Sequence, residues 1–362
     1  MLNLDFYLKL MVDRGAADLF FSAGAAPHLK GDEGMEPVGD APFDSERIRE
    51  LAESLMDVRQ IERFERDLEM NLALERAGIG RFRVNVFLQR GQVSIVIRHV
   101  RDHIPSVQQL NLPAYFHQLV LAPRGLILVI GSTGCGKSTT LASMLDHRAA
   151  SACSHILTVE DPIEYVHDHK RSVVDQREIG FDTLSYANAL KNAMRESPDV
   201  ILVGEIRDSE TMQTVLSFAQ TGHLVLSTLH ASNVAQALQR IVSFYPEEAH
   251  ERVLRDLSTT MVALIAQRLI PHRGGGRIPA IEVMTPTPRL RKLVEQGDIE
   301  AIPRAMEEER NAQVQTMDQS LYAMFRRGLI TEEEALRNAD SGSDLALRIR
   351  LTGAGPAQFG AG

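Results

Sequence analysis

The chain has 362 residues, of which 44% are hydrophobic and 24% are charged, a balance that excludes disordered and fibrous proteins. One hydrophobic core is rarely enough at this length, so two domains are expected. The formal net charge of -9 argues against a polynucleotide as the main partner, because clustered Lys and Arg bind such backbones; no nucleic acid is therefore expected.

Membrane and disulfide-rich classes are also disfavoured. No apolar stretch approaches the roughly 20 residues that a membrane span needs. Charged residues interrupt the amino terminus, where a signal peptide would be apolar, so a cytoplasmic location is expected. The two cysteines, Cys135 and Cys153, are too few for a disulfide framework or a four-cysteine zinc module.

Residues 1–100 predict a small α+β domain. Leu4, Leu8 and Met11 recur at helical spacing before Gly15, which indicates an opening amphipathic helix. Strand-like segments and one helical stretch follow. The strands are expected at 17–24, 81–90 and 93–100, and the helix at 48–64.

A polar segment at 101–113 is typical of a linker between two cores and suits a hinge. After it, four apolar runs alternate with helical segments, which predicts a parallel sheet covered on both faces, within a second domain at 114–352. The runs lie at 126–130, 155–159, 200–203 and 224–228.

The chain beyond Pro246 is expected to be mostly helical. The exception is GGGRIPAIEVM at 274–284, whose glycines predict a hairpin turn. Thr331 and Glu334 have capping-box spacing for a late helix. Residues 353–362 are expected to form a flexible tail.

GSTGCGKST at 131–139 matches the phosphate-binding pattern G-x-x-x-x-G-K-[ST]. The match gains weight because it directly follows an apolar strand and precedes a helical run. Backbone N–H groups of such a loop and the positive end of the next helix hold phosphate oxygens. The candidate binding residues are Gly131, Ser132, Thr133, Gly134, Cys135, Gly136, Lys137, Ser138 and Thr139.

Three side chains of this loop have specific expected roles. Lys137 is expected to reach the β and γ phosphates of a nucleotide. Ser138 is expected to hold Mg²⁺ through its hydroxyl oxygen. Thr139 is expected to contact the α-phosphate, and a plain helix-surface position is the alternative.

Acidic residues follow two of the predicted strands, at the sheet edge where open parallel sheets bind ligands. Glu160, Asp161 and Glu164 follow the second run, and Glu205 follows the third. One carboxylate must orient or deprotonate water and another must hold Mg²⁺. Either cluster suits either role, and solvated loops are the alternative. Gly204 stands where many P-loop proteins carry a metal-binding Asp, so Glu205 is expected to act through water.

Two histidines flank the fourth run, in TGHLVLSTLHA at 221–231. His230 follows the strand and is expected to sense the γ-phosphate, with a buried structural histidine as the alternative. His223 precedes the strand. The extended chain between them disfavours a shared metal site.

Together these segments resemble the type II/IV secretion ATPases over nearly the whole chain. The similar motifs are GSTGCGKST (Walker A), TVEDPIEYVH (Asp box), LVGEIRD (Walker B) and TGHLVLSTLHA (His box). GAADLFFSAG at 15–24 and RFRVNVF at 81–87 are similar to segments of the pilus retraction branch, the PilT/PilU group. ADSGSDLALRIRL at 339–351 looks closest to the PilU branch of accessory motors. RLRKLV at 289–294 departs from the Ala-Ile-Arg-Asn-Leu-Ile of the PilT branch and fits that choice.

The resemblance implies a homo-hexameric ring of subunits, each with a PAS-like amino-terminal domain joined to a RecA-like ATPase domain. ATP and Mg²⁺ would lie between the two domains. Glu164 corresponds to the general base of the family, and Glu205 to the Walker B acid. The arginine fingers would be Arg81, Arg83 and Arg98, each with a solvated surface arginine as the alternative.

The resemblance also implies a place in the cell and a set of partners. The chain would drive or assist type IV pilus retraction, and hence twitching motility, with a PilT-like motor as a partner. It would work on an inner-membrane platform protein at the pilus base, on the cytoplasmic side.

Three other functions stay open at this point. An extension or secretion motor would share the nucleotide motifs, but such motors usually add a four-cysteine zinc insert that two cysteines cannot build. An adaptor that binds ATP and docks on an active ring is disfavoured by the intact Lys137, Glu164 and Glu205. A hexameric helicase would bind DNA at low salt and change its turnover.

Overall fold

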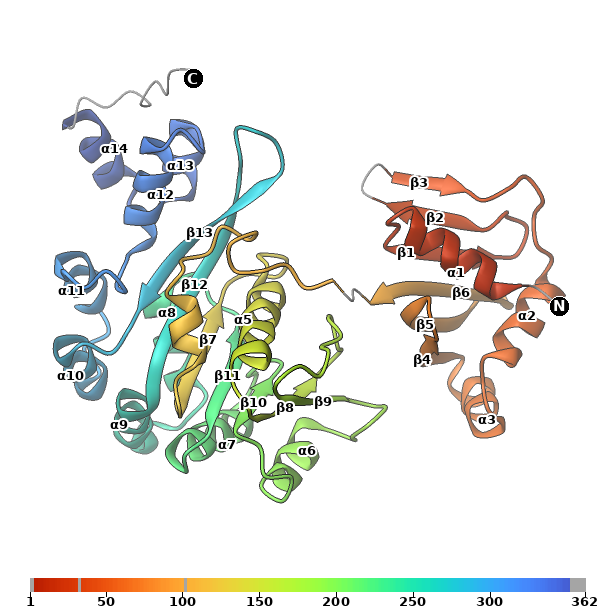
Figure 1. The fold of residues 1–362 in the computed structure, drawn as a ribbon, viewed down its shortest axis with the longest axis horizontal. Coiled ribbons are helices and arrows are strands. Elements are labelled where there is room, and N and C mark those ends of the chain that lie inside the picture. Colours follow the sequence, from red (N-terminus) through yellow and green to blue (C-terminus); the bar gives the residue numbers. More distant parts are fainter. Residues whose placement is uncertain (1–2, 32–33, 101–102, 352–362) are drawn as a thin grey trace. The chain divides into compact units, whose positions relative to one another are not determined.

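The computed structural model describes residues 3–31, 34–100 and 103–351, which fall into two compact units (Figure 1). The first unit contains the described residues up to His103 together with Glu164–Val166. The second contains Ile104–Ile163 and the chain from His167 onward. Each unit has hydrophobic core residues of its own.

The first unit is a six-stranded antiparallel sheet with helices on one face. Its strand order is β3-β2-β1-β6-β5-β4. Its elements are α1 (Leu4–Asp13), β1 (Asp18–Ser22), β2 (His28–Gly31), β3 (Gly34–Pro37), α2 (Ser45–Ser54), α3 (Val58–Asp67), β4 (Glu69–Arg76), β5 (Gly80–Gln89) and β6 (Gln92–Val100).

Side-chain alternation explains the two faces of this sheet. On β5, Phe82 and Val84 are buried in the core, and the residues between them point to the opposite face. The predicted opening helix is present as α1. The stretch predicted to be helical at 48–64 is confirmed, and it consists of most of α2 and most of α3 with a break between them. The break occurs because Asp57 starts a new helix through a capping box with Gln60.

The second unit contains a seven-stranded sheet in the order β13-β12-β7-β11-β10-β8-β9. All neighbouring strands pair in parallel except β13, which is antiparallel to β12. The elements up to the last strand are α4 (Phe116–Val120), β7 (Gly125–Ile130), α5 (Lys137–Ser151), β8 (His155–Glu160), β9 (Val173–Glu178), α6 (Tyr186–Ala193), β10 (Val200–Val203), α7 (Ser209–Gln220), β11 (Leu224–Leu229), α8 (Val234–Ser243), the 3-10 turn η1 (Glu247–Ala249), α9 (His250–Thr260), β12 (Met261–Pro271) and β13 (Arg277–Met284). The four predicted strands and the covered sheet are confirmed, and the fold class is α/β as expected.

Both faces of this sheet are buried, as the continuous apolar runs predicted. On β7, Leu126 and Leu128 belong to the core on one face, whereas Ile127 and Val129 belong to the core on the other. The second of these cores also takes in Val107 and Leu112, from the segment that the sequence suggested as a linker. Residues 101–102 of that segment lie outside the described residues.

The chain after α9 departs from its mostly helical prediction. Residues 261–271 form β12, which pairs in parallel with β7 and antiparallel with β13. An apolar run of this length does not distinguish a buried helix from a buried strand. Backbone hydrogen bonds to both neighbouring strands, β7 and β13, make this segment a strand. The hairpin predicted at the glycines is confirmed, and Gly275 and Gly276 have φ values of 93° and 70° in its turn.

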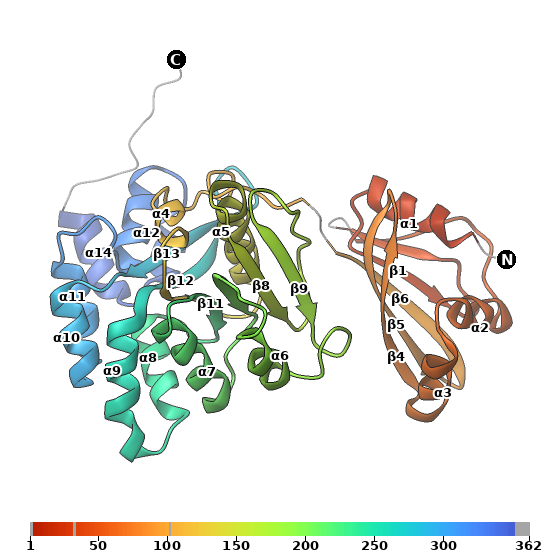
Figure 2. The ribbon, with the colours of Figure 1, turned by 60° about the horizontal axis from the view of Figure 1, so that its bottom comes forward.

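Five further helices complete the second unit: α10 (Pro288–Gln296), α11 (Ile302–Glu308), α12 (Met317–Arg326), α13 (Glu332–Asn338) and α14 (Gly342–Leu351). Of these, α10, α11, α12 and α14 lie on the β13 side of the second unit, away from β9 (Figure 2). The predicted cap of α13 is present, since Thr331 accepts a hydrogen bond from the Glu334 amide at 3.1 Å. The expected tail at 353–362 lies outside the described residues. Across residues 3–31, 34–100 and 103–351, none of the helices combines the length and the apolar character of a bilayer span.

Candidate functional site

The predicted strand–loop–helix arrangement is present between β7 and α5. Gly134 and Gly136 in the loop have φ values of 79° and 91°, a backbone conformation that side-chain-bearing residues adopt only at a cost. A Cβ atom on Gly136 would also lie 2.8 Å from the Nε2 atom of Gln267. Conformation and crowding together therefore require glycine at position 136.

Lys137 is held inside this loop at the first residue of α5. Its Nζ donates hydrogen bonds to the carbonyl oxygens of Gly131 and Ser132, both at 2.9 Å. Burial lowers the pKa of the ammonium, and the nearby Glu205 carboxylate opposes that change. The positive charge therefore lies where the loop would receive a phosphate group.

Gln267 on β12 supports the loop from behind, and sequence analysis missed it. Its Nε2 donates to the carbonyl oxygen of Cys135 at 2.6 Å, and its Oε1 accepts from the Thr140 hydroxyl at 2.8 Å. The side chain is buried. One amide thus joins the loop to the first turn of α5. In the sequence, Gln267 stands out only as a polar residue inside an apolar run. Its hydrogen-bond partner Cys135 is 132 positions away, so the sequence does not indicate their contact.

Replacing Gln267 with Leu should weaken nucleotide binding and stability together. The substitution leaves the Thr140 hydroxyl and the Cys135 carbonyl without their partner in a buried place, which costs about 1–3 kcal/mol per group. Urea unfolding monitored by circular dichroism should show the loss, and titration with a fluorescent ATP analogue should show weaker binding. Gln118→Leu, on the exposed side of α4, is the matched control. Wild-type affinity in Gln267→Leu would show that the amide does not support the loop.

Glu205 and His230 meet because they follow neighbouring parallel strands, β10 and β11. The Oε2 atom of Glu205 lies 3.4 Å from Nε2 of His230. The other carboxylate oxygen accepts a hydrogen bond from the Arg207 guanidinium. Burial lowers the pKa of His230, the Lys137 charge lowers it further, and Glu205 opposes both. A neutral imidazole and a carboxylate therefore face each other at the sheet edge near Lys137.

The absence of a side chain at Gly204 has a structural cause. A Cβ atom there would lie 2.7 Å from the hydroxyl oxygen of Tyr186, so the aspartate common in P-loop proteins does not fit. That hydroxyl is buried and has no hydrogen-bond partner among the described residues. Burial raises the pKa of Tyr186, and the charges of Asp161 and Glu205 raise it further. A buried donor beside carboxylates is the kind of group that bound water satisfies.

The residues present fit a nucleotide-bound Mg²⁺ ion. Ser138 is exposed on the first turn of α5, and its hydroxyl oxygen and the Glu205 carboxylate are the oxygen donors that Mg²⁺ prefers. In the part of the chain that the structure describes, no group of three or more His, Cys, Asp or Glu side chains could hold a metal ion. Mg²⁺ at phosphate sites needs only one or two protein ligands, because phosphates and water complete its shell. The unpartnered Tyr186 hydroxyl suits such a hydrated ion.

The acidic residues at and after the end of β8 have different surroundings. Glu160 is held in place, since its Oε1 accepts from the Thr158 hydroxyl at 2.7 Å and from Gln176 Nε2 at 3.2 Å. Glu164 is exposed and belongs to the first unit. Glu205 is thus the carboxylate that the second unit itself brings to Lys137 and His230.

The three predicted finger arginines lie together on the first unit. Arg81 and Arg83 are two residues apart on β5, so their side chains point to the same face of the sheet. Arg83 is the register partner of Arg98 on β6. They share the sheet face opposite the helices. Arg98 forms an ion pair with the buried Asp18, with Nε at 2.7 Å from Oδ1, and this hydrogen bond raises the pKa of Arg98. The structure therefore places a cationic group on one face of the amino-terminal sheet.

His223 lies at the opposite end of β11 from His230. Its Nδ1 atom is 3.1 Å from the carbonyl oxygen of Phe218, and its ring meets the Phe218 ring edge-on. These local contacts give it a structural role. The expectation that the two histidines share no metal site agrees with this placement.

Comparison with known proteins points to one family. The family profile described as Type II/IV secretion system protein matches residues 54–337. Type IV pilus ATPase PilU of Pseudomonas aeruginosa is 44% identical over 345 residues, covering 95% of this chain and 90% of its own. The type IV pilus retraction ATPase PilT of the same organism is 39% identical, covering 92% and 96%. The crystal structure of the pilus retraction motor PilT with bound ADP aligns with a TM-score of 0.89 at 39% identity, covering 96% of this chain and 100% of that one.

Proposed function

The chain belongs to the PilT/PilU group of the type II/IV secretion ATPase family and is an ATP hydrolase; from that premise we propose that it is a hexameric motor that drives or assists type IV pilus retraction. The carrying observation is the meeting of Lys137, Glu205 and His230 at one sheet edge. The similarity to PilU supports an accessory, PilU-like role.

The phosphate loop at 131–139 is proposed to bind ATP. Its backbone N–H groups and Lys137 would hold the phosphates, and Thr139 would contact the α-phosphate. Ser138 and Glu205 would hold Mg²⁺, with Glu205 acting through bound water; when bound, the ion would neutralise phosphate charge. The ADP bound by the PilT relative supports a nucleotide at this loop.

The catalytic roles follow from charge and proton affinity. The neutral His230 imidazole has one N–H group, at the nitrogen that faces Glu205, and a γ-phosphate oxygen placed beside Glu205 would share this donor. Glu164 is proposed as the general base that orients the attacking water. The fingers Arg81, Arg83 and Arg98 would stabilise the transition-state charge, an effect worth about 10³ to 10⁵ in rate where it operates.

Hydrolysis is proposed to move the amino-terminal domain (1–100) relative to the ATPase domain (114–352) through the linker at 101–113. The separate cores of the two units support this division. ATP would draw the domains together and hydrolysis would release them. In a ring, this motion would act on an inner-membrane platform protein, beside a PilT-like motor, on the cytoplasmic side of the pilus base.

Phosphate release from ATP by the purified full-length chain tests the proposal. Turnover that requires Mg²⁺ and does not change when DNA is added is expected. No turnover in any buffer would favour the adaptor, which binds ATP and docks on another motor. Stimulation by DNA would favour a helicase and would contradict the expectation of no nucleic-acid partner.

A further inference from the structure

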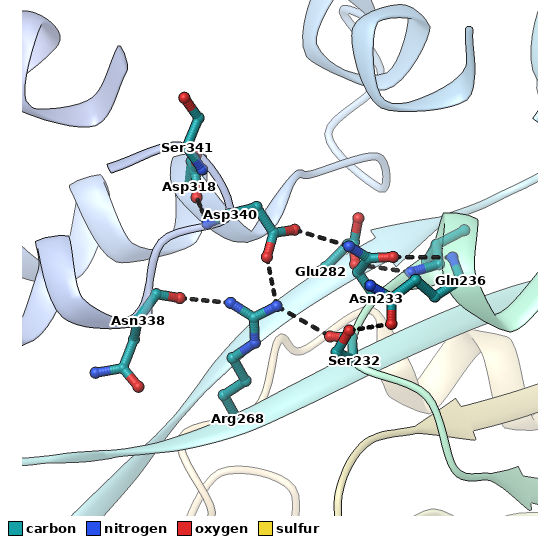
Figure 3. Close-up of polar contacts among 10 residues, drawn as sticks. Ser232, Asn233, Gln236, Arg268, Glu282, Asp318, Asn338, Asp340 and Ser341 are labelled. Atoms are coloured by element: carbon teal, nitrogen blue, oxygen red, sulfur yellow. Dashed lines mark hydrogen bonds and ion pairs between the residues drawn. The ribbon is translucent and has the colours of Figure 1, made fainter. Parts of the chain in front are cut away.

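One arginine connects the turn after His230 with the C-terminal helices (Figure 3). Arg268 on β12 donates from its NH2 group to the carbonyl oxygen of Ser232 at 3.0 Å. The same group pairs with Asp340, and the NH1 group donates to the carbonyl oxygen of Asn338. Asn338 is the last residue of α13, and Asp340 lies just before α14. A single guanidinium thus bridges two parts of the chain that are far apart in sequence.

The turn after His230 is held at several further points. Asp340 uses its second oxygen to accept from Asn233 Nδ2 at 3.2 Å. Asn233 caps α8 by accepting from the Gln236 amide at 2.9 Å. The amide of Val234 donates to Oε2 of Glu282 at 3.0 Å, and that carboxyl is buried. Residues 232–234 are therefore fixed by their carbonyl, side-chain and amide groups.

Asp340 is itself held in place by α12. Both carboxylate oxygens of Asp318 accept backbone amides, from Asp340 at 2.7 Å and from Ser341 at 2.9 Å. Helices α12, α13 and α14 share a hydrophobic core with β12 and β13. The position of Asp340, and hence of the Arg268 guanidinium, is therefore set by this group of helices.

Strand geometry links this contact to the phosphate loop. Gln267 and Arg268 are neighbours on β12, and neighbouring side chains of a strand point to opposite faces. Gln267 contacts the phosphate loop, and Arg268 contacts Ser232 in the turn that follows His230. One strand therefore fixes two sides of the candidate site.

We propose that Arg268 and Asp340 are positioning residues for ATP hydrolysis, because together they hold the turn at 231–234 and keep His230 against Glu205. The C-terminal helices thereby set the position of a catalytic side chain. The inference rests on the proposed role of His230 at the γ-phosphate. It assigns a catalytic consequence to a contact between two residues that lie outside the predicted nucleotide-binding segments.

Conservative variants separate positioning from simple stability. Arg268→Lys keeps the charge but loses the two-pronged geometry of the guanidinium, and Asp340→Asn keeps the shape but loses the charge. Each should lower kcat on the order of tenfold to a hundredfold, since small displacements of catalytic groups are costly. Nucleotide affinity should stay unchanged, because Lys137 and its loop are untouched. Arg337→Lys, on the exposed side of α13, is the matched control and should keep full turnover.

A double variant that also removes the His230 side chain gives the sharper test. Arg268→Lys should have no further effect on kcat in a His230→Ala background, because the side chain that it positions is gone. Independent, multiplying losses would overturn the proposal. Unchanged kcat in Arg268→Lys with only a lower unfolding midpoint would overturn it as well.

NMR signals of the His230 imidazole in the full-length chain report the position of this ring without turnover. In Arg268→Lys these signals should shift, because the ring loses its fixed place beside Glu205, whereas in Arg337→Lys they should not. Unchanged signals in Arg268→Lys would contradict the positioning role. If the wild-type chain hydrolysed no ATP, the proposed function would fail, and this measurement would still decide whether Arg268 positions His230.

Discussion

Lys137→Ala is expected to abolish measurable ATP turnover. The substitution removes the buried positive charge that the carbonyl oxygens of the phosphate loop hold in place. Phosphoryl transfer depends mainly on such charges. The loss in kcat/KM should be at least about 10³-fold, which corresponds to about 4 kcal/mol of transition-state stabilisation. Phosphate release from ATP measures turnover, and a fluorescent ATP analogue measures binding.

The fold should tolerate this change, because burial already disfavours the charged form of Lys137. A thermal midpoint close to that of the wild type is therefore expected. Lys191→Ala, at an exposed position of α6, is the control and should hydrolyse ATP normally. Turnover retained in Lys137→Ala would show that the loop is not the catalytic nucleotide site.

Glu205→Gln is expected to lower kcat by about 10² to 10³-fold with little change in nucleotide affinity. Gln keeps the size of the side chain but loses the charge that proton transfer and metal-bound water require. In the wild-type chain the Glu205 carboxylate raises the pKa of His230. Loss of its negative charge should therefore lower that pKa further. Single-turnover kinetics would separate the slowed chemical step from binding.

Glu210→Gln is the matched control, since Glu210 is exposed in the first turn of α7. Glu164→Gln tests the proposed general base in the same assay. Wild-type kcat in Glu205→Gln would refute the role of that carboxylate. A lower kcat in both Glu205→Gln and Glu164→Gln would support separate catalytic roles for the two carboxylates.

Much of the nucleotide site follows from sequence because its signals are local. The phosphate pattern spans eight consecutive residues, 131–138, which follow a continuous apolar strand and run into the next helix. Glu205 and His230 lie just beyond two of the predicted apolar runs, at 200–203 and 224–228. Parallel strands place their carboxyl ends at one edge, so this rule predicts that both side chains lie at that edge. Their contact depends on the strand order, which makes these two strands neighbours.

The parts that sequence did not predict depend on distant pairing. Residues 261–271 have no local feature that separates strand from helix, and their partner β7 ends at Ile130. Gln267 and Arg268 acquire their roles only through that pairing. The sequence also identified Gly204 as unusual, but the cause is the hydroxyl of Tyr186, which reaches it from α6.

The central claim is that nucleotide state changes the arrangement of the two domains, and a distance measurement between them tests it most directly. Cys153 is exposed in the second unit and Cys135 is buried, so Glu65→Cys on the exposed side of α3 would provide a second accessible thiol for a fluorophore pair. Energy transfer should differ between a non-hydrolysable ATP analogue and ADP, and Lys137→Ala should abolish the difference. The same distance distribution in every nucleotide state of the active chain would contradict the account.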